Sequence, residues 1–113
     1  MEIKVRGKFK KRKVGFNFDM YAWFLLGELK NKQIHELQQL DQDEFFNGIV
    51  YTAAVSWHKD KGRHIWFTPD DVAGWLDDLP QKQIRQLANE FLASKVFGKT
   101  LSEWSDEDDK KKQ

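Results

Sequence analysis

The sequence predicts a mostly α-helical fold: one small domain of about four to five helices with a short N-terminal β-hairpin over about residues 2–16. Two observations predict the helices, because apolar residues recur at three- and four-residue spacing from residue 18 onward and helix-start residues precede these stretches. A third predicts the hairpin, because apolar and charged residues alternate on both sides of a Gly-Lys turn. We assign residues 1–100 to this domain and residues 101–113 to a charged, flexible C-terminal tail.

The composition indicates a chain that folds around one core. Its 113 residues suit a single domain, and the aromatic content of 14% supplies burial that disordered sequences lack. The chain has no cysteine, which excludes disulfides and thiolate metal sites. We see no signal peptide, and the longest apolar run, residues 20–26, is far shorter than the roughly 18 residues of a membrane span. We therefore expect a cytoplasmic protein without membrane association.

In the predicted hairpin, the apolar residues change from one alternating register to the other. Ile3 and Val5 alternate with charged residues on the first strand, and Val14 and Phe16 continue the alternation on the second. The apolar parity shifts between Phe9 and Val14, which predicts a bulge or a bend. An isolated hairpin is barely stable, so we expect this one to pack on helices.

The next segment, residues 18–29, is apolar on nearly every side and starts after a capping residue, Asn17 or Asp19. A helix of this kind is buried on most faces. A small domain has little to cover it with, so either the helix is central or another subunit covers part of it. Tyr21 and Trp23 are therefore candidates for partner contacts. A short amphipathic piece with Ile34, Leu37 and Leu40 follows.

The helix that begins at Asp41 has the clearest pattern, and Glu44 stands at capping-box spacing from it. Its apolar half comprises Phe45, Phe46, Ile49, Val50, Ala53, Ala54 and Trp57. Its other half comprises Asn47, Thr52, His58 and Lys59, which we place toward solvent. Gly62 is a suitable stop.

Two more helices complete the domain. Thr68-Pro69-Asp70-Asp71 is a strong start, with a capping Thr, a first-turn Pro and two carboxylates at the positive end of the helix dipole. The apolar residues of this helix are Val72, Trp75, Leu76 and Leu79. Pro80 ends it or opens the next, whose apolar residues are Ile84, Leu87, Ala88, Phe91, Leu92 and Val96, with a stop near Gly98.

The sequence favours no catalytic, metal or cofactor site. His35, His58 and His64 lack metal-ligand spacing, and we interpret them as surface histidines. No Gly-x-Ser-x-Gly elbow or glycine-rich phosphate loop occurs. The carboxylate pairs at residues 70–71 and 77–78 fit a helix start and a solvent-facing surface better than acid–base chemistry. We expect a protein that is not an enzyme.

Residues 4–13 carry the strongest charge feature, including the basic patch Lys8, Lys10, Lys11, Arg12 and Lys13. Such a ribbon could contact nucleic acid phosphates. It could equally be a strand edge that lysines protect from aggregation, or pair with the acidic residues of the tail, Glu103 to Asp109. We favour the second and third interpretations, because the rest of the chain is net acidic.

The order of these elements resembles a known family. The carrying segments are Met-Glu-Ile-Lys-Val-Arg-Gly-Lys-Phe at the start, the apolar helix after Phe16-Asn17-Phe18, the segment from Asp43 to Val55, and the segment from Phe67 to Leu76 with a last amphipathic helix. Over about residues 1–100 the chain looks like the tail assembly chaperones of long-tailed phages and prophages of Gram-positive bacteria. The order and lengths of the elements carry the resemblance, rather than one motif.

The resemblance implies a helical protein that self-associates into a ring or spiral in the host cytoplasm. It implies binding to the tape measure protein and solubilising it, and helping to recruit the major tail tube protein. It also implies a frameshifted longer form, for which the codons of Lys110 to Lys112 are a candidate slippery stretch. Trp66, Phe67 and Trp104 are further partner-contact candidates, because they lie in connections or in the tail, although packing on a neighbouring helix would explain them equally. The alternative function is a small nucleic-acid-binding protein that uses the basic hairpin.

Overall fold

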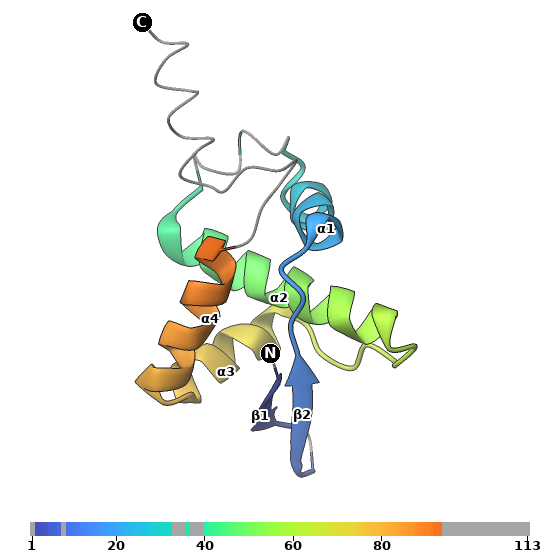
Figure 1. Cartoon of the computed structure of the whole chain (residues 1–113), viewed down its shortest axis with the longest axis vertical. Coiled ribbons are helices and arrows are strands. Elements are labelled where there is room, and N and C mark those ends of the chain that lie inside the picture. The colour runs from blue at the N-terminus through green and yellow to red at the C-terminus, as the bar shows by residue number, and fades with distance from the viewer. Residues whose placement is uncertain (1, 8, 33–35, 37–39, 94–113) are drawn as a thin grey trace, which may run out of the picture.

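The computed structural model describes residues 2–7, 9–32, 36 and 40–93. These contain strands β1 (Glu2–Arg6) and β2 (Lys11–Gly15), followed by helices α1 (Met20–Lys30), α2 (Gln42–Asp60), α3 (Pro69–Asp78) and α4 (Gln81–Ala93) (Figure 1). The predicted mostly helical fold with an N-terminal hairpin is confirmed. The expected stop near Gly98 and the tail 101–113 lie outside the described residues, as does most of the short amphipathic piece, including Ile34 and Leu37.

The hairpin is antiparallel and regular. Its register is continuous from the pair Glu2–Gly15 to the pair Arg6–Lys11, so the predicted bulge is absent from the two strands. The parity change has another cause: Phe9 belongs to the turn between the strands, where it is 92% exposed. The backbone N–H of Gly7 donates to the carbonyl of Lys10 across this turn, at 3.0 Å.

Helix α2 forms the centre of the molecule. Figure 1 shows α1 on one side of it and the hairpin and α3 on the other, and α2 contacts all three. The assignment of Thr52 and His58 to solvent was therefore wrong, since both are buried, at 1% and 2% exposure. A single amphipathic pattern predicts one covered side, whereas here the chain returns to cover the second side as well.

The predicted capping residues are confirmed at two helices and fail in part at a third. Asp19 caps α1, and its carboxylate accepts from the backbone N–H of Ala22 at 3.0 Å and from the hydroxyl of Ser56 on α2 at 2.9 Å. Thr68 and Asp71 form a complete capping box at the start of α3. Pro80 opens α4, because its carbonyl accepts from the N–H groups of Gln83 and Ile84.

The capping box expected at α2 does not form. The helix begins after Asp41 as predicted, but this side chain makes no capping hydrogen bond. The carboxylate of Glu44 instead accepts from the ammonium of Lys30, at the end of α1, at 2.9 Å. The ion pair between helices has displaced the local motif.

The core is rich in aromatic rings and joins all six elements. Trp23, Phe45 and Phe91 meet with ring centroids 5.5–5.7 Å apart, which joins α1, α2 and α4. Strand β2 lies so close to α2 that a Cβ at Gly15 would overlap the indole of Trp57. This close approach fixes the hairpin against α2 and thereby positions its basic residues.

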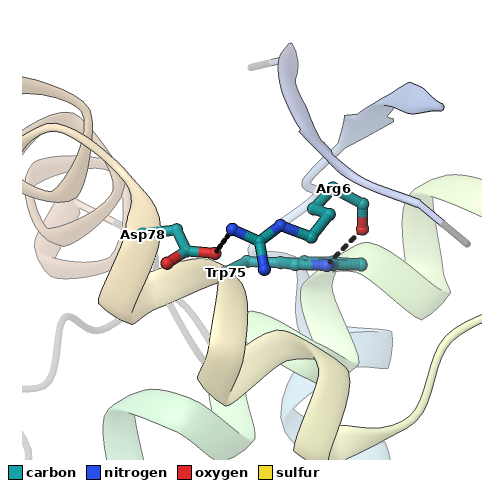
Figure 2. Close-up of polar contacts among 3 residues, drawn as sticks. All are labelled: Arg6, Trp75 and Asp78. Carbon is teal, nitrogen blue, oxygen red and sulfur yellow. Dashed lines mark hydrogen bonds and ion pairs between the residues drawn. The ribbon is translucent and has the colours of Figure 1, made fainter.

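The hairpin is also attached to α3, as Figure 2 shows. The indole N–H of Trp75 donates to the carbonyl of Arg6 at 3.2 Å, and the guanidinium of Arg6 pairs with Asp78 at 3.0 Å. The ion pair is exposed and therefore contributes little to the free energy of folding. The indole that donates the hydrogen bond belongs to Trp75, whose side chain is buried. Both ends of the hairpin are therefore held by helices.

Candidate functional site

Helix α1 presents an apolar outer face, formed by Tyr21, Phe24, Leu25 and Leu29. These positions follow a spacing of three, four and eight residues from Tyr21, so they lie on one side of the helix. Tyr21, Phe24 and Leu29 are 37%, 49% and 46% exposed, and Leu25 is half-buried. The opposite side, with Ala22, Trp23, Leu26 and Gly27, is buried in the core.

The outer face of α1 has a polar margin. The ammonium of Lys59, near the end of α2, donates to the hydroxyl of Tyr21 at 2.8 Å. Glu28 is exposed and lies one turn after Phe24 and Leu25, directly before Leu29. An apolar centre with charged neighbours is the usual composition of a surface that binds another protein.

The structure places the other predicted partner contacts differently. Trp23 is 2% exposed and packs in the core. Phe67 is 4% exposed, and its ring meets those of Tyr51, His58 and Trp75. Both side chains are buried in the core, so neither presents a surface to a partner. Trp104 lies outside the described residues.

Trp66 is half-buried and belongs to a second surface, a basic cleft of about 530 Å³. One wall comes from the turn of the hairpin and β2, and the other from the end of α2 and the connection that follows it. The residues that line the cleft are Lys10, Lys11, Arg12, Lys13, His58, Arg63, His64 and Trp66. Lys8, the remaining residue of the predicted patch, lies outside the described residues.

Sequence reasoning missed the second wall of this cleft. Arg63 and His64 stand in a connection after Gly62, without a periodic pattern to assign them a face. A second cluster of basic residues, at positions 59–64, is the signal that could have indicated them. The predicted helix stop at Gly62 lies within this cluster, so the chain can reverse there and run back along α2. Gly62 has φ +67°, a left-handed conformation that allows this reversal.

The two arginines of the cleft are held by indoles. The guanidinium carbon of Arg12 lies 4.5 Å from the ring centroid of Trp66, and that of Arg63 lies 5.1 Å from the ring of Trp57. Trp66 itself packs on Phe67 and Trp75 at centroid distances of 5.5 Å. Stacking on anchored rings restricts the orientation of both guanidinium groups.

The charge of the cleft is unbalanced. None of its lining residues is acidic, and among the described residues the one ion pair of a lining cation joins Lys13 to Glu2, at 2.9 Å. His58 adds a buried imidazole whose Nδ1–H donates to the carbonyl of Ala54 at 2.9 Å. Burial lowers the pKa of His58 from its ordinary value of 6.5, and the nearby charges of Arg63 and Arg12 lower it further.

The remaining features offer less chemistry. A second cleft of about 510 Å³ lies between β1 and α4 and is lined mainly by side-chain amides and two glutamates. In the described part of the chain, no group of three or more histidine, aspartate or glutamate side chains could hold a metal ion. No helix among residues 2–7, 9–32, 36 and 40–93 is long and apolar enough to cross a membrane.

Comparison with known proteins adds no relative. No family model matches the chain, and no curated protein or solved structure matches it. The functional assignment therefore depends on the two surfaces described above and on the order of the elements.

Proposed function

We propose that this protein is a phage tail assembly chaperone, which binds the tape measure protein, keeps it soluble and helps to recruit the tail tube protein. The observation that supports the proposal best is the outer face of α1. It places Tyr21, Phe24 and Leu29 in solvent on a helix whose other side is already buried. A chaperone needs an exposed apolar surface of this kind in order to bind an apolar partner.

The physical chemistry of the partner fits such a surface. A tape measure protein is a long, helical and apolar chain, which would aggregate before assembly unless its apolar surface were covered. A helix with aromatic and aliphatic residues along one side contacts another helix by packing side chains between neighbouring turns. Fully burying each large apolar side chain contributes roughly 1.5–3 kcal/mol, so many subunits along one partner would hold it by repeated modest contacts.

The proposal includes self-association, since a ring or spiral would place many copies of α1 along one elongated partner. The protein acts stoichiometrically and without catalysis in this scheme. Its partners are the tape measure protein, the tail tube protein and further copies of itself, in the cytoplasm of the bacterial host. The longer frameshifted form, for contact with the tube protein, belongs to the same proposal.

Co-expression with the tape measure protein tests this proposal. We expect the tape measure protein to stay in the soluble fraction only when this protein is present. The double variant Phe24→Gln/Leu29→Gln should lose most of the effect, because it removes the apolar centre of the outer face of α1. Leu92→Gln is the control, since Leu92 is 56% exposed and belongs to α4 rather than α1. Equal solubility with and without the protein would refute the proposal.

A further inference from the structure

We propose that the basic cleft binds the sugar–phosphate backbone of a short segment of single-stranded nucleic acid. This goes beyond the chaperone role and does not depend on it. Taken alone, the basic residues of the hairpin were better explained as a protected strand edge or as a partner of the acidic tail. The structure changes this balance, because Arg63, His58, His64 and Trp66 form a second wall opposite Lys10, Lys11, Arg12 and Lys13.

The first argument is charge. Five permanent cations line one cleft, namely Lys10, Lys11, Arg12, Lys13 and Arg63. Only Lys13 has an acidic partner among the described residues. A protected strand edge accounts for the lysines of the hairpin, but not for Arg63 on the opposite wall of the same cleft. The four cations that have no acidic partner in the described part of the chain raise the local concentration of an anion.

The second argument is preorganisation. A guanidinium group presents a planar fork of N–H donors that matches two phosphate oxygens. Arg12 and Arg63 lie against the indoles of Trp66 and Trp57, so part of their rotamer entropy is already lost in the free protein. His58 stiffens the same region, because its imidazole is bonded to Ala54 and packed between Trp57 and Phe67.

The third argument concerns the kind of polyanion. The lining contains cations, histidines and one indole but no aliphatic side chain. Arginine clusters also recognise acidic peptide motifs. A strand of nucleic acid presents a phosphate at every nucleotide, however, and so matches cations that are spread over both walls of the cleft. A cationic groove is typical of sites for single strands, whose phosphates are accessible.

Fluorescence anisotropy of a labelled oligothymidylate of about ten nucleotides tests the inference, with the full chain as the binding protein. If the four cations without an acidic partner in the described ranges each contact one phosphate, log Kd should depend on log salt with a slope of magnitude about 2.8. The affinity should therefore fall roughly 50-fold between about 50 and about 200 mM NaCl. Lys11→Gln/Arg63→Gln removes two of these cations, one from each wall, and should reduce the magnitude of the slope to about 1.4.

The matched control is Lys82→Gln/Arg85→Gln, which removes the same charge from exposed positions of α4 outside the cleft. It should bind as the unchanged protein does, and unchanged thermal unfolding should show that both double variants are folded. Equal weakening by both variants, or no binding at low salt, would overturn the inference. It would also be overturned if a synthetic peptide of residues 100–113 bound in a manner dependent on Lys11 and Arg63 while the oligonucleotide did not, because the cleft would then be a carboxylate site.

Discussion

His58 is the residue where the local pattern and the tertiary structure disagree most. It belongs to the half of α2 that the sequence pattern marks as polar, and yet it is 2% exposed and lines the basic cleft. The sequence pattern records only that one half of α2 is apolar. It does not record that Phe67 returns to pack on the imidazole, at 5.0 Å between ring centroids. Burial of His58 could therefore not be predicted from its own helix.

The buried His58 predicts a pH dependence of stability. Its pKa is lowered in the folded protein, mainly by burial, so below pH 6.5 the unfolded chain takes up a proton more readily than the folded one. The contribution of His58 to the free energy of unfolding is therefore complete above pH 6.5. It is lost as the pH falls from this value through the lower pKa of the folded protein. Urea unfolding between about pH 5 and about pH 8 should show this decline.

Two histidine variants separate this contribution from others. His58→Gln should flatten the decline, whereas His64→Gln, at an exposed position, should retain it. The pKa of Glu2 is also lowered, chiefly by its hydrogen bond to Lys13, but its ordinary value of 4.5 places that titration below the pH range of the measurement. An identical slope in the unchanged protein and in His58→Gln would contradict the assignment.

At the scale of elements, we expect replacement of two glycines by alanine to change the stability of the fold in opposite directions. Gly15→Ala places a Cβ into the indole of Trp57, where β2 meets α2, and overpacking of this kind typically costs about 1–3 kcal/mol. Gly74 lies on the exposed side of α3, and Gly74→Ala adds a Cβ there, where nothing lies within 4 Å. It should stabilise the fold by about 0.5–1 kcal/mol, because alanine is the better helix former.

Chemical denaturation of the two glycine variants measures both signs directly. Thermal unfolding of Gly15→Ala should occur at lower temperature and that of Gly74→Ala at higher temperature than in the unchanged protein. A neutral Gly15→Ala would mean that β2 does not approach α2 as closely as described. The position of the hairpin wall of the basic cleft would then also be in question.

The helix starts show which elements the sequence could predict and why. Thr68 and Asp71 satisfy each other within one turn, so the local signal is sufficient. Asp41 and Glu44 have the same spacing, but Lys30 of another helix takes the carboxylate of Glu44. The hairpin wall of the cleft was likewise local and visible in the sequence, whereas the wall with Arg63 and His64 depends on a tertiary reversal. The outer face of α1 lies between these cases: its excess of apolar residues was predicted, but not which side would be exposed.

At the scale of the whole molecule, the outer face of α1 predicts self-association that depends on concentration. The core has already taken one side of α1, and with the described residues in place Tyr21, Phe24 and Leu29 remain 37%, 49% and 46% exposed. Sedimentation velocity over rising protein concentration should show dimers or larger assemblies, because burying these side chains between copies removes apolar surface from water. Phe24→Gln/Leu29→Gln should shift the protein toward monomer, whereas Leu92→Gln, which changes a more exposed leucine on α4, should not. A protein that stays monomeric at every concentration would rule out contact between copies through α1 and leave that face to the tape measure protein alone.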